Sequence, residues 1–141
     1  MVTPIETEII IKLIVAATIG MLIGLERELH RKPAGMRTHA LVCIGATLFT
    51  IMSFSFAGEN VDTSRIAANI VMGIGFLGAG IVFRAEDRVK GITTAAEMWV
   101  LAAIGISIGI GMYYAAAVAT IIVLAILWPA KLLEKKVVRK R

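Results

Sequence analysis

The chain has 141 residues, of which 58% are hydrophobic and 18% are charged, and its formal net charge is +5. Its mean hydropathy is +0.85, and it is more apolar than soluble domains, which are about half apolar and about a quarter charged. The single cysteine excludes an intrachain disulfide. The basic residues lie between apolar segments, so we attribute them to membrane topology and anionic lipid, not to nucleic acid.

Apolar segments recur along the chain at the length that crosses a bilayer. A hydrocarbon core about 30 Å thick needs about 20 helical residues. The stretch from Met98 to Pro129 contains no charge. As one helix it would be about 48 Å long, so we divide it at Gly109-Ile110-Gly111. The sequence therefore predicts an all-α polytopic membrane protein with about five transmembrane helices, over residues 9–26, 38–56, 66–83, 94–110 and 112–128.

The distribution of lysine and arginine predicts the orientation. The loop after the first segment, with its flanks, holds four of them, the loop after the third holds three, and residues 131–141 hold six. Five crossings place these thirteen of the fifteen basic residues on one side, as the positive-inside rule requires. We expect the N-terminus outside, a transmembrane domain over 1–130, and a basic cytoplasmic tail over 131–141. The tail either orients the chain or lies on the membrane surface.

Two sequences have the form of a helix capping box, and one of them has a second interpretation. Thr3-Pro4-Ile5-Glu6 predicts the start of the first helix. Thr94-Ala95-Ala96-Glu97 has the same pattern, so Glu97 is expected to bond back to the start of its own helix. Alternatively, Glu97 is a functional intramembrane carboxylate. Asn69, inside the third segment, is expected to form a hydrogen bond between helices.

Glycines are concentrated inside the apolar segments. Gly73-Ile74-Gly75-Phe76-Leu77-Gly78-Ala79-Gly80 contains a GxGxxG spacing, but it lacks the preceding strand and soluble helix of a dinucleotide site. Small residues let helix backbones approach closely in lipid, which is the better interpretation. These contacts are either within the chain or between copies in a homo-oligomer. The predicted packing residues are Gly20, Gly24, Gly73, Gly75, Gly78, Gly80, Gly105 and Gly109.

The densest charged group is Glu26-Arg27-Glu28 at the end of the first segment, with Arg37 just before the second. Either glutamate can pair with a basic residue on the same side, namely Arg37, Arg84 or Arg88. One interpretation is an interfacial network of salt bridges, and the other is a cation or partner site. Magnesium favours carboxylate oxygens, but the arginines oppose a cation. No catalytic triad or paired carboxylates are present, so we predict no enzyme and no cofactor, and we leave magnesium binding open.

Three segments together resemble the membrane domain of the MgtC/SapB family. They are the residues 20–28 (GMLIGLERE), the residues 33–39 (PAGMRTH), and the glycine run 73–80 followed by 91–96 (GITTAA) and Trp99. The resemblance covers about residues 15–105. It implies a small protein of the bacterial or archaeal plasma (inner) membrane that is tied to magnesium limitation. In pathogens the family is tied to survival inside macrophages, and in some members to restraint of the F-type ATP synthase.

The resemblance favours a regulatory role through contact with another membrane protein, such as the F-type ATP synthase. The alternative is a small oligomeric magnesium or cation transporter or channel, which would need polar groups near mid-membrane. This chain differs from the family in two respects. Longer members carry a soluble C-terminal domain, whereas this chain stops after its basic tail, and the virulence branch has Asn and Cys where this chain has Thr93 and Val100. Both differences count against a virulence role. The predicted functional face consists of Glu26, Arg27, Glu28, Arg37, Thr38, Arg84, Thr93, Thr94 and Glu97.

Overall fold

A computed structural model of the chain describes residues 3–56, 62–85 and 88–138. Its helices are α1 (Pro4–Leu29), α2 (Met36–Ser55), α3 (Ser64–Ile81), α4 (Ile92–Ile110) and α5 (Tyr113–Val138). Two short strands, β1 (Phe83–Ala85) and β2 (Arg88–Lys90), pair antiparallel between α3 and α4. The sequence did not predict this hairpin. Each helix overlaps one predicted segment, and the third segment was predicted two residues too long, because Phe83 belongs to β1. The all-α architecture is confirmed.

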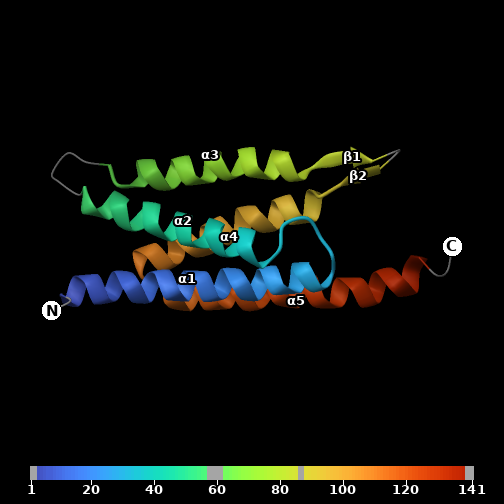
Figure 1. Cartoon of the computed structure of the whole chain (residues 1–141), viewed down its shortest axis with the longest axis horizontal. Coiled ribbons are helices and arrows are strands. Elements are labelled where there is room, and N and C mark those ends of the chain that lie inside the picture. The colour runs from blue at the N-terminus through green and yellow to red at the C-terminus, as the bar shows by residue number, and fades with distance from the viewer. Residues whose placement is uncertain (1–2, 57–61, 86–87, 139–141) are drawn as a thin grey trace.

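The helices run alternately in opposite directions along the long axis of the molecule (Figure 1). One end carries the α1–α2 connection, the β1–β2 hairpin and the end of α5 (Figure 1). The opposite end carries the start of α1, the start of α3 and the turn between α4 and α5. This alternation is what five crossings of a membrane require, and it brings the two basic loops to the same end. We call it the hairpin end.

The first four helices are long and apolar enough to cross a membrane, so the chain is a polytopic membrane protein. The apolar part of α5, Tyr113–Trp128, is shorter and spans about 24 Å at 1.5 Å per residue. The helix nevertheless continues through Pro129 to Val138. Residues 131–138 of the predicted tail are therefore helical, while the side chains of residues 129–141 lie outside the described part.

Two of the predicted helix boundaries depend on specific hydrogen bonds. The capping box at the start of α1 is confirmed: Glu6 N–H donates to Thr3 Oγ1 at 3.3 Å, and Thr3 N–H donates to Glu6 Oε2 at 2.6 Å. Gly111 ends α4 in the left-handed region, with φ +96°. The amide of Met112 then donates to the Ser107 carbonyl at 2.8 Å, in the pattern of a Schellman turn. The predicted division between the last two helices is confirmed.

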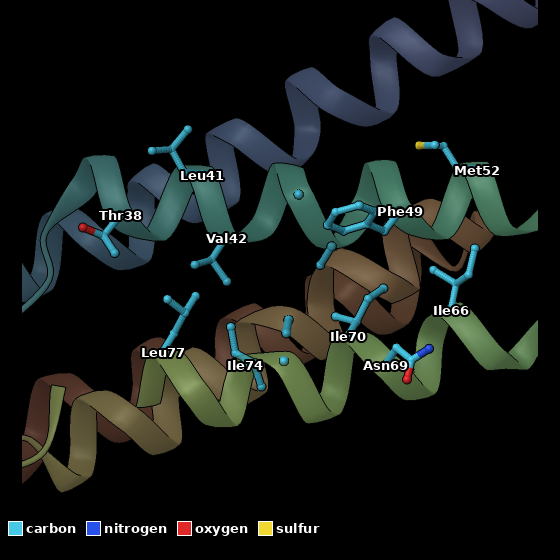
Figure 2. A pocket seen from close by; sticks show the side chains of 14 residues that line it. Thr38, Leu41, Val42, Phe49, Met52, Ile66, Asn69, Ile70, Ile74 and Leu77 are labelled. Atoms are coloured by element: carbon cyan, nitrogen blue, oxygen red, sulfur yellow. The ribbon is translucent and has the colours of Figure 1, made fainter. Parts of the chain in front are cut away.

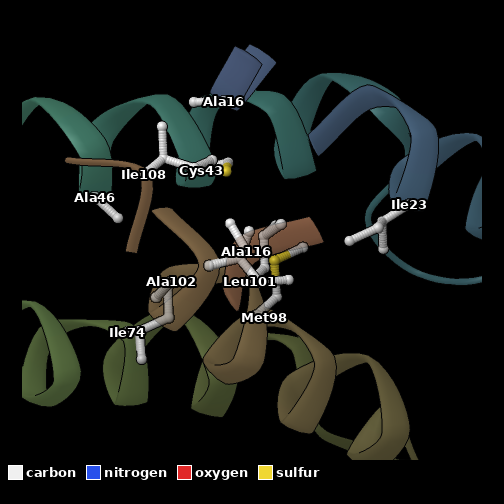
Figure 3. Packing of buried hydrophobic residues seen from close by; sticks show 11 residues of the cluster. Ala16, Ile23, Cys43, Ala46, Ile74, Met98, Leu101, Ala102, Ile108 and Ala116 are labelled. Atoms are coloured by element: carbon white, nitrogen blue, oxygen red, sulfur yellow. The ribbon is translucent and has the colours of Figure 1, made fainter. Parts of the chain in front are cut away.

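Helix α4 occupies the centre of the bundle and packs against all four other helices. Figure 3 shows buried side chains from every helix meeting around it. Met98, Leu101, Ile104 and Ile108 recur on α4 at helical spacing and are 1% exposed or less. This spacing gives α4 a buried apolar stripe, whereas α3 buries only Ile74 and Gly78 among its residues.

Four of the predicted packing glycines permit a close approach to α2. A Cβ added at Gly20 or Gly24 of α1 would lie 2.6–2.7 Å from α2 backbone atoms. One added at Gly105 or Gly109 of α4 would lie 2.6–2.7 Å from a carbonyl oxygen or a side-chain carbon of α2. Side chains at these positions would overlap α2, so α2 is held between two glycine-lined helices.

The glycines of α3 do not form such contacts. A Cβ at Gly78 would be in ordinary contact with Ala95 of α4, at 3.5 Å. Gly73, Gly75 and Gly80 would gain nothing within 4 Å. Packing of these three against another helix of the same chain is therefore a wrong interpretation, and contacts between copies remain a prediction.

Candidate functional site

Arg27, near the end of α1, is the centre of a buried group of ionisable side chains at the hairpin end. Its Nε lies 2.8 Å from Oε2 of Glu97, and its Nη2 donates to Thr94 Oγ1 at 3.1 Å. A third contact joins Nη1 to Glu26 Oε2 at 3.5 Å. Arg27 is 4% exposed. The Nε–Oε2 contact is an ion pair whose N–H is poorly aligned with the oxygen. Arg27 thus joins α1 to α4.

His39, in the first turn of α2, completes the group and is fully buried. Its Nε2 lies 3.2 Å from Glu97 Oε1, and its Nδ1 lies 2.9 Å from the carbonyl oxygen of Gly35. Glu97 therefore contacts Arg27 with one oxygen and His39 with the other. We call Glu26, Arg27, His39, Thr94 and Glu97 the Arg27 cluster. It ties together the ends of three helices.

Local sequence explains why these side chains meet. Thr94 and Glu97 are three residues apart, so they lie on the same face of α4. Gly24 has no side chain, which lets the start of α2 approach α1 and brings His39 toward Arg27. The cluster thus depends on the same close backbone approach that packs α1 against α2.

The capping interpretation of Glu97 is wrong. Helix α4 begins at Ile92, and its N-cap is Gly91, three residues before the predicted cap Thr94. Gly91 makes no side-chain capping bond. Gly91 has φ +91°, and a Cβ there would overlap the carbonyl oxygen of Ile81. Because the chain enters α4 through this glycine, Thr94 and Glu97 lie inside the helix and bond to Arg27.

The glutamates of α1 also differ from the predicted pairing with Arg37. Glu26 pairs with Arg27, and its Oε1 lies 2.7 Å from Nδ1 of His30. Glu28 accepts the backbone N–H of Met36 at 3.0 Å, which satisfies a donor at the start of α2. The side chains of Arg84 and Arg88 lie outside the described part of the chain.

The structure divides the predicted functional face into a buried and an exposed part. Glu26, Arg27, Thr94 and Glu97 come together in the cluster, whereas four other members are exposed: Glu28, Arg37, Thr38 and Thr93. Sequence reasoning missed His39, because a single histidine on an otherwise apolar helix gives no signal of its partner. The close-packing glycines of α1 were the only indication that the start of α2 would come near Arg27.

Arg27 occupies the place that a divalent cation would need. Its guanidinium contacts both Glu26 and Glu97, so a positive charge already stands between the two carboxylates. Within residues 3–56, 62–85 and 88–138, no group of three His, Cys, Asp or Glu side chains is arranged to hold a metal ion. Of the two interpretations of these charges, the observed contacts are those of a salt-bridge network.

The buried hydroxyl groups farther along the bundle are satisfied by backbone carbonyls. Thr47 donates across the helices to the carbonyl of Gly105 at 2.9 Å. Thr50 and Thr120 donate to carbonyls four residues earlier in their own helices, at 2.8 and 2.7 Å. These hydroxyls therefore serve packing inside the bundle.

An apolar groove of about 800 Å³ opens between α2 and α3. Figure 2 shows Val42 and Phe49 of α2 facing Ile70 and Ile74 of α3 across it. Asn69 lies on its α3 wall and is exposed. The hydrogen bond between helices that the sequence predicts for Asn69 is not among the contacts of the described residues, and it stays a prediction.

Comparisons with known proteins identify the family. The model of the MgtC family matches residues 13–136. Protein MgtC of Brucella abortus is 46% identical over 111 residues, which is 79% of this chain and 46% of that protein. Protein MgtC of Salmonella typhimurium is 45% identical over 115 residues, 82% of this chain and 49% of that protein.

A relative from Escherichia coli K12 carries the name putative magnesium transporter YhiD. It is 48% identical over 113 residues, which is 75% of this chain and 53% of that protein. The chain thus spans about half the length of the curated relatives it matches. No solved structure matches it.

Proposed function

This chain belongs to the MgtC family, and from that premise we propose that it is a regulatory protein of the prokaryotic inner membrane. It acts in magnesium limitation or proton-energy homeostasis. It works by contact with another membrane protein, such as the F-type ATP synthase that the resemblance implies. Its hairpin end faces the cytoplasm and carries the contact.

The observation that carries this proposal is the position of Arg27 between two carboxylates. A transporter for a divalent cation needs oxygen ligands that are free to replace water. Here the buried carboxylates of Glu26 and Glu97 both contact the guanidinium of Arg27, which stands where a divalent cation would have to bind. The cluster is thus built to hold three helices together, which suits a rigid platform.

The exposed residues around the platform are the contact surface. Arg37 and Thr38 begin α2 beside His39, and Thr93 lies beside Thr94 on α4, and all three are exposed. A partner at the cytoplasmic end would meet these side chains first, while the buried cluster fixes their positions. Arg37 carries a full charge on this surface, so its contribution to binding is the easiest to measure.

Growth in low magnesium tests whether the contact surface is needed for function. Arg37→Ala should abolish the growth that depends on this protein, while the protein remains in the membrane at its normal level. The matched control is Lys32→Ala, which removes an exposed basic side chain from the same end. Equal activity of both variants with the wild type would reject the contact surface. Co-purification of the partner from gently solubilised membranes should be lost in parallel with growth.

Topology is tested separately. A reporter fused after Arg141 is expected to report the cytoplasm, and one inserted near residue 60 is expected to report the outside. The second insertion lies outside the described residues. A C-terminal reporter found outside would reverse the orientation and remove the surface from the cytoplasm.

The second candidate function is magnesium transport, which the name of the Escherichia coli relative favours. Purified protein in liposomes containing a magnesium-sensing dye distinguishes the two. Regulation predicts no protein-dependent entry. Saturable entry that is lost in Asn69→Ala or Glu97→Gln would replace the regulatory proposal with a transporter.

A further inference from the structure

The imidazole ring of His39 is placed between two hydrogen-bond acceptors. On one side, Nδ1 lies 2.9 Å from the Gly35 carbonyl oxygen, which can only accept. On the other side, Nε2 lies 3.2 Å from Oε1 of Glu97. Both contacts are inside the protein, because His39 is fully buried and Glu97 is 5% exposed.

A neutral imidazole satisfies only one of these acceptors. It has one N–H donor and one bare nitrogen, so one ring nitrogen would point its lone pair at an oxygen lone pair. The conflict disappears if both ring nitrogens of His39 carry hydrogen. It also disappears if Nδ1 of His39 carries hydrogen and Glu97 is protonated and donates to Nε2. Both arrangements contain one proton more than a neutral histidine with an ionised glutamate.

Charge balance leads to the same proton count. With the extra proton, the His39–Glu97 pair has no net charge, and Arg27 is balanced by Glu26, which is 7% exposed. Without it, the pair carries one negative charge, and the buried group as a whole becomes negative. An uncompensated charge in a low-dielectric site is strongly unfavourable. The packing of the site thus favours the protonated pair.

The groups that face the pair come from each helix packed around it. Helix α1 contributes Arg27 and Glu26, the latter also in contact with partly exposed His30. Helix α4 contributes Thr94, which is neutral. On α2, the neighbouring Arg37 is exposed. Arg27 is thus the only described cation in contact with Glu97 apart from His39 itself.

We propose that His39 and Glu97 form a buried proton-binding site that joins α2 to α4 at the hairpin end. The bound proton completes the only described side-chain contact between these helices within the Arg27 cluster. Its loss leaves Glu97 facing a bare imidazole nitrogen, which loosens the start of α2, where Arg37 and Thr38 lie. The ligand of the site is the proton, and the site responds to the pH of the compartment at that end. The inference stands whether or not the proposed regulatory function does.

Nuclear magnetic resonance of the whole protein in detergent micelles tests the proton count. The chain has two histidines, so ¹⁵N-histidine labelling gives two sets of ring signals, and the variant His30→Asn assigns them. ¹³C labelling of glutamate carboxyls reports Glu97, assigned with Glu97→Gln. At neutral pH, we expect the His39–Glu97 pair to hold the extra proton, either as two N–H groups on His39 or as one N–H group beside a protonated Glu97.

The variants separate the pair from its surroundings. Glu97→Gln keeps the shape of the side chain and removes its charge, so a His39 that carries two N–H groups in the wild type should carry one in the variant at neutral pH. Glu28→Gln is the matched control, since Glu28 is an exposed glutamate at the same end, and it should change nothing. A His39 with a single N–H beside an ionised Glu97 at neutral pH overturns the proposal. Where wild-type His39 carries two N–H groups, an equal response of His39 to both variants overturns it as well. If Glu97→Gln does not fold, the spectrum of the native protein decides alone.

Discussion

Helices α1, α2 and α4 pack closely against one another, whereas α3 packs loosely at the side of the bundle. Helices α1, α2 and α4 approach closely over four glycines and bury an ionisable cluster where they meet. Helix α3 also has glycines, but three of them face open space, and Phe76 is 83% exposed. A glycine-rich apolar segment is therefore not by itself a packed segment. What distinguishes α1 and α4 is that α2 lies directly against their glycines.

The largest expected effect comes from breaking the charged contact on the packed side. Glu97→Leu leaves Arg27 buried without its main partner and should lower the free energy of unfolding by about 3–5 kcal/mol. Thermal or denaturant unfolding in detergent measures this loss. The double variant Arg27→Met with Glu97→Leu should recover most of it, because two apolar side chains replace the pair. A double variant no more stable than Glu97→Leu would contradict this account.

The next effect compares the two sets of glycines directly. Gly24→Ala puts a Cβ 2.6 Å from the Met36 Cα and should cost about 1–3 kcal/mol through overpacking. Gly73→Ala meets nothing within 4 Å and should leave the unfolding free energy unchanged or slightly higher. Unfolding of both variants under the same conditions is the measurement. A loss at Gly73 equal to that at Gly24 would mean that α3 packs against a second copy.

A smaller effect is expected at the hydroxyl that crosses between helices. Thr47→Val removes the hydrogen bond to the Gly105 carbonyl and should cost about 0.6 kcal/mol, the average for such bonds in membrane bundles. Thr18→Val is the control, because exposed Thr18 donates only to Ile14 of its own helix, at 2.8 Å. The difference between the two melting curves isolates the contact between helices.

The smallest effect lies outside the membrane, at the start of α3. The side-chain and backbone donors of Ser64 hold the pKa of Asp62 below its ordinary value of 3.8. A carboxyl with a lowered pKa in the folded state stabilises it above that ordinary value, and the contribution is lost as acid brings the pH down through the folded-state pKa. Asp62→Asn should therefore flatten the acid limb of the stability profile slightly. The measurement is the free energy of unfolding of the variant and of the wild type at a series of acidic pH values. The same dependence on pH in both proteins would contradict the prediction.

Sequence patterns predicted the helices well because length and hydropathy are local properties. The capping box at Thr3 and the turn at Gly111 were predicted from residues that bond within a few positions. The partners of Glu97 were not, because Arg27 and His39 lie far from it in sequence. The pattern from Thr94 to Glu97 also satisfied a local rule, and only the position of Gly91 shows that the helix starts earlier.

The same limit explains the glycines. Spacing alone treats Gly20 and Gly73 alike, since both lie in apolar helices that follow the same rule. Whether a neighbour covers a glycine depends on how the helices are arranged around α4, which is a property of the whole chain. The capping box at Thr3 needed only its own helix and was confirmed, whereas the one at Thr94 failed because Gly91 starts the helix earlier. The packing predicted for glycines succeeded where α2 is the neighbouring helix.

The turn at Gly111 has a consequence for how the protein enters its membrane. Helices α4 and α5 are separated by only two residues, Gly111 and Met112, so the second helix must fold back as soon as the first is complete. The apolar part of α5 is short for an independent crossing. Insertion of α4 and α5 together, as one helical hairpin, removes that difficulty, because the strongly apolar α4 supplies the hydrophobicity that α5 lacks. Membrane insertion of α5 is then expected to depend on α4.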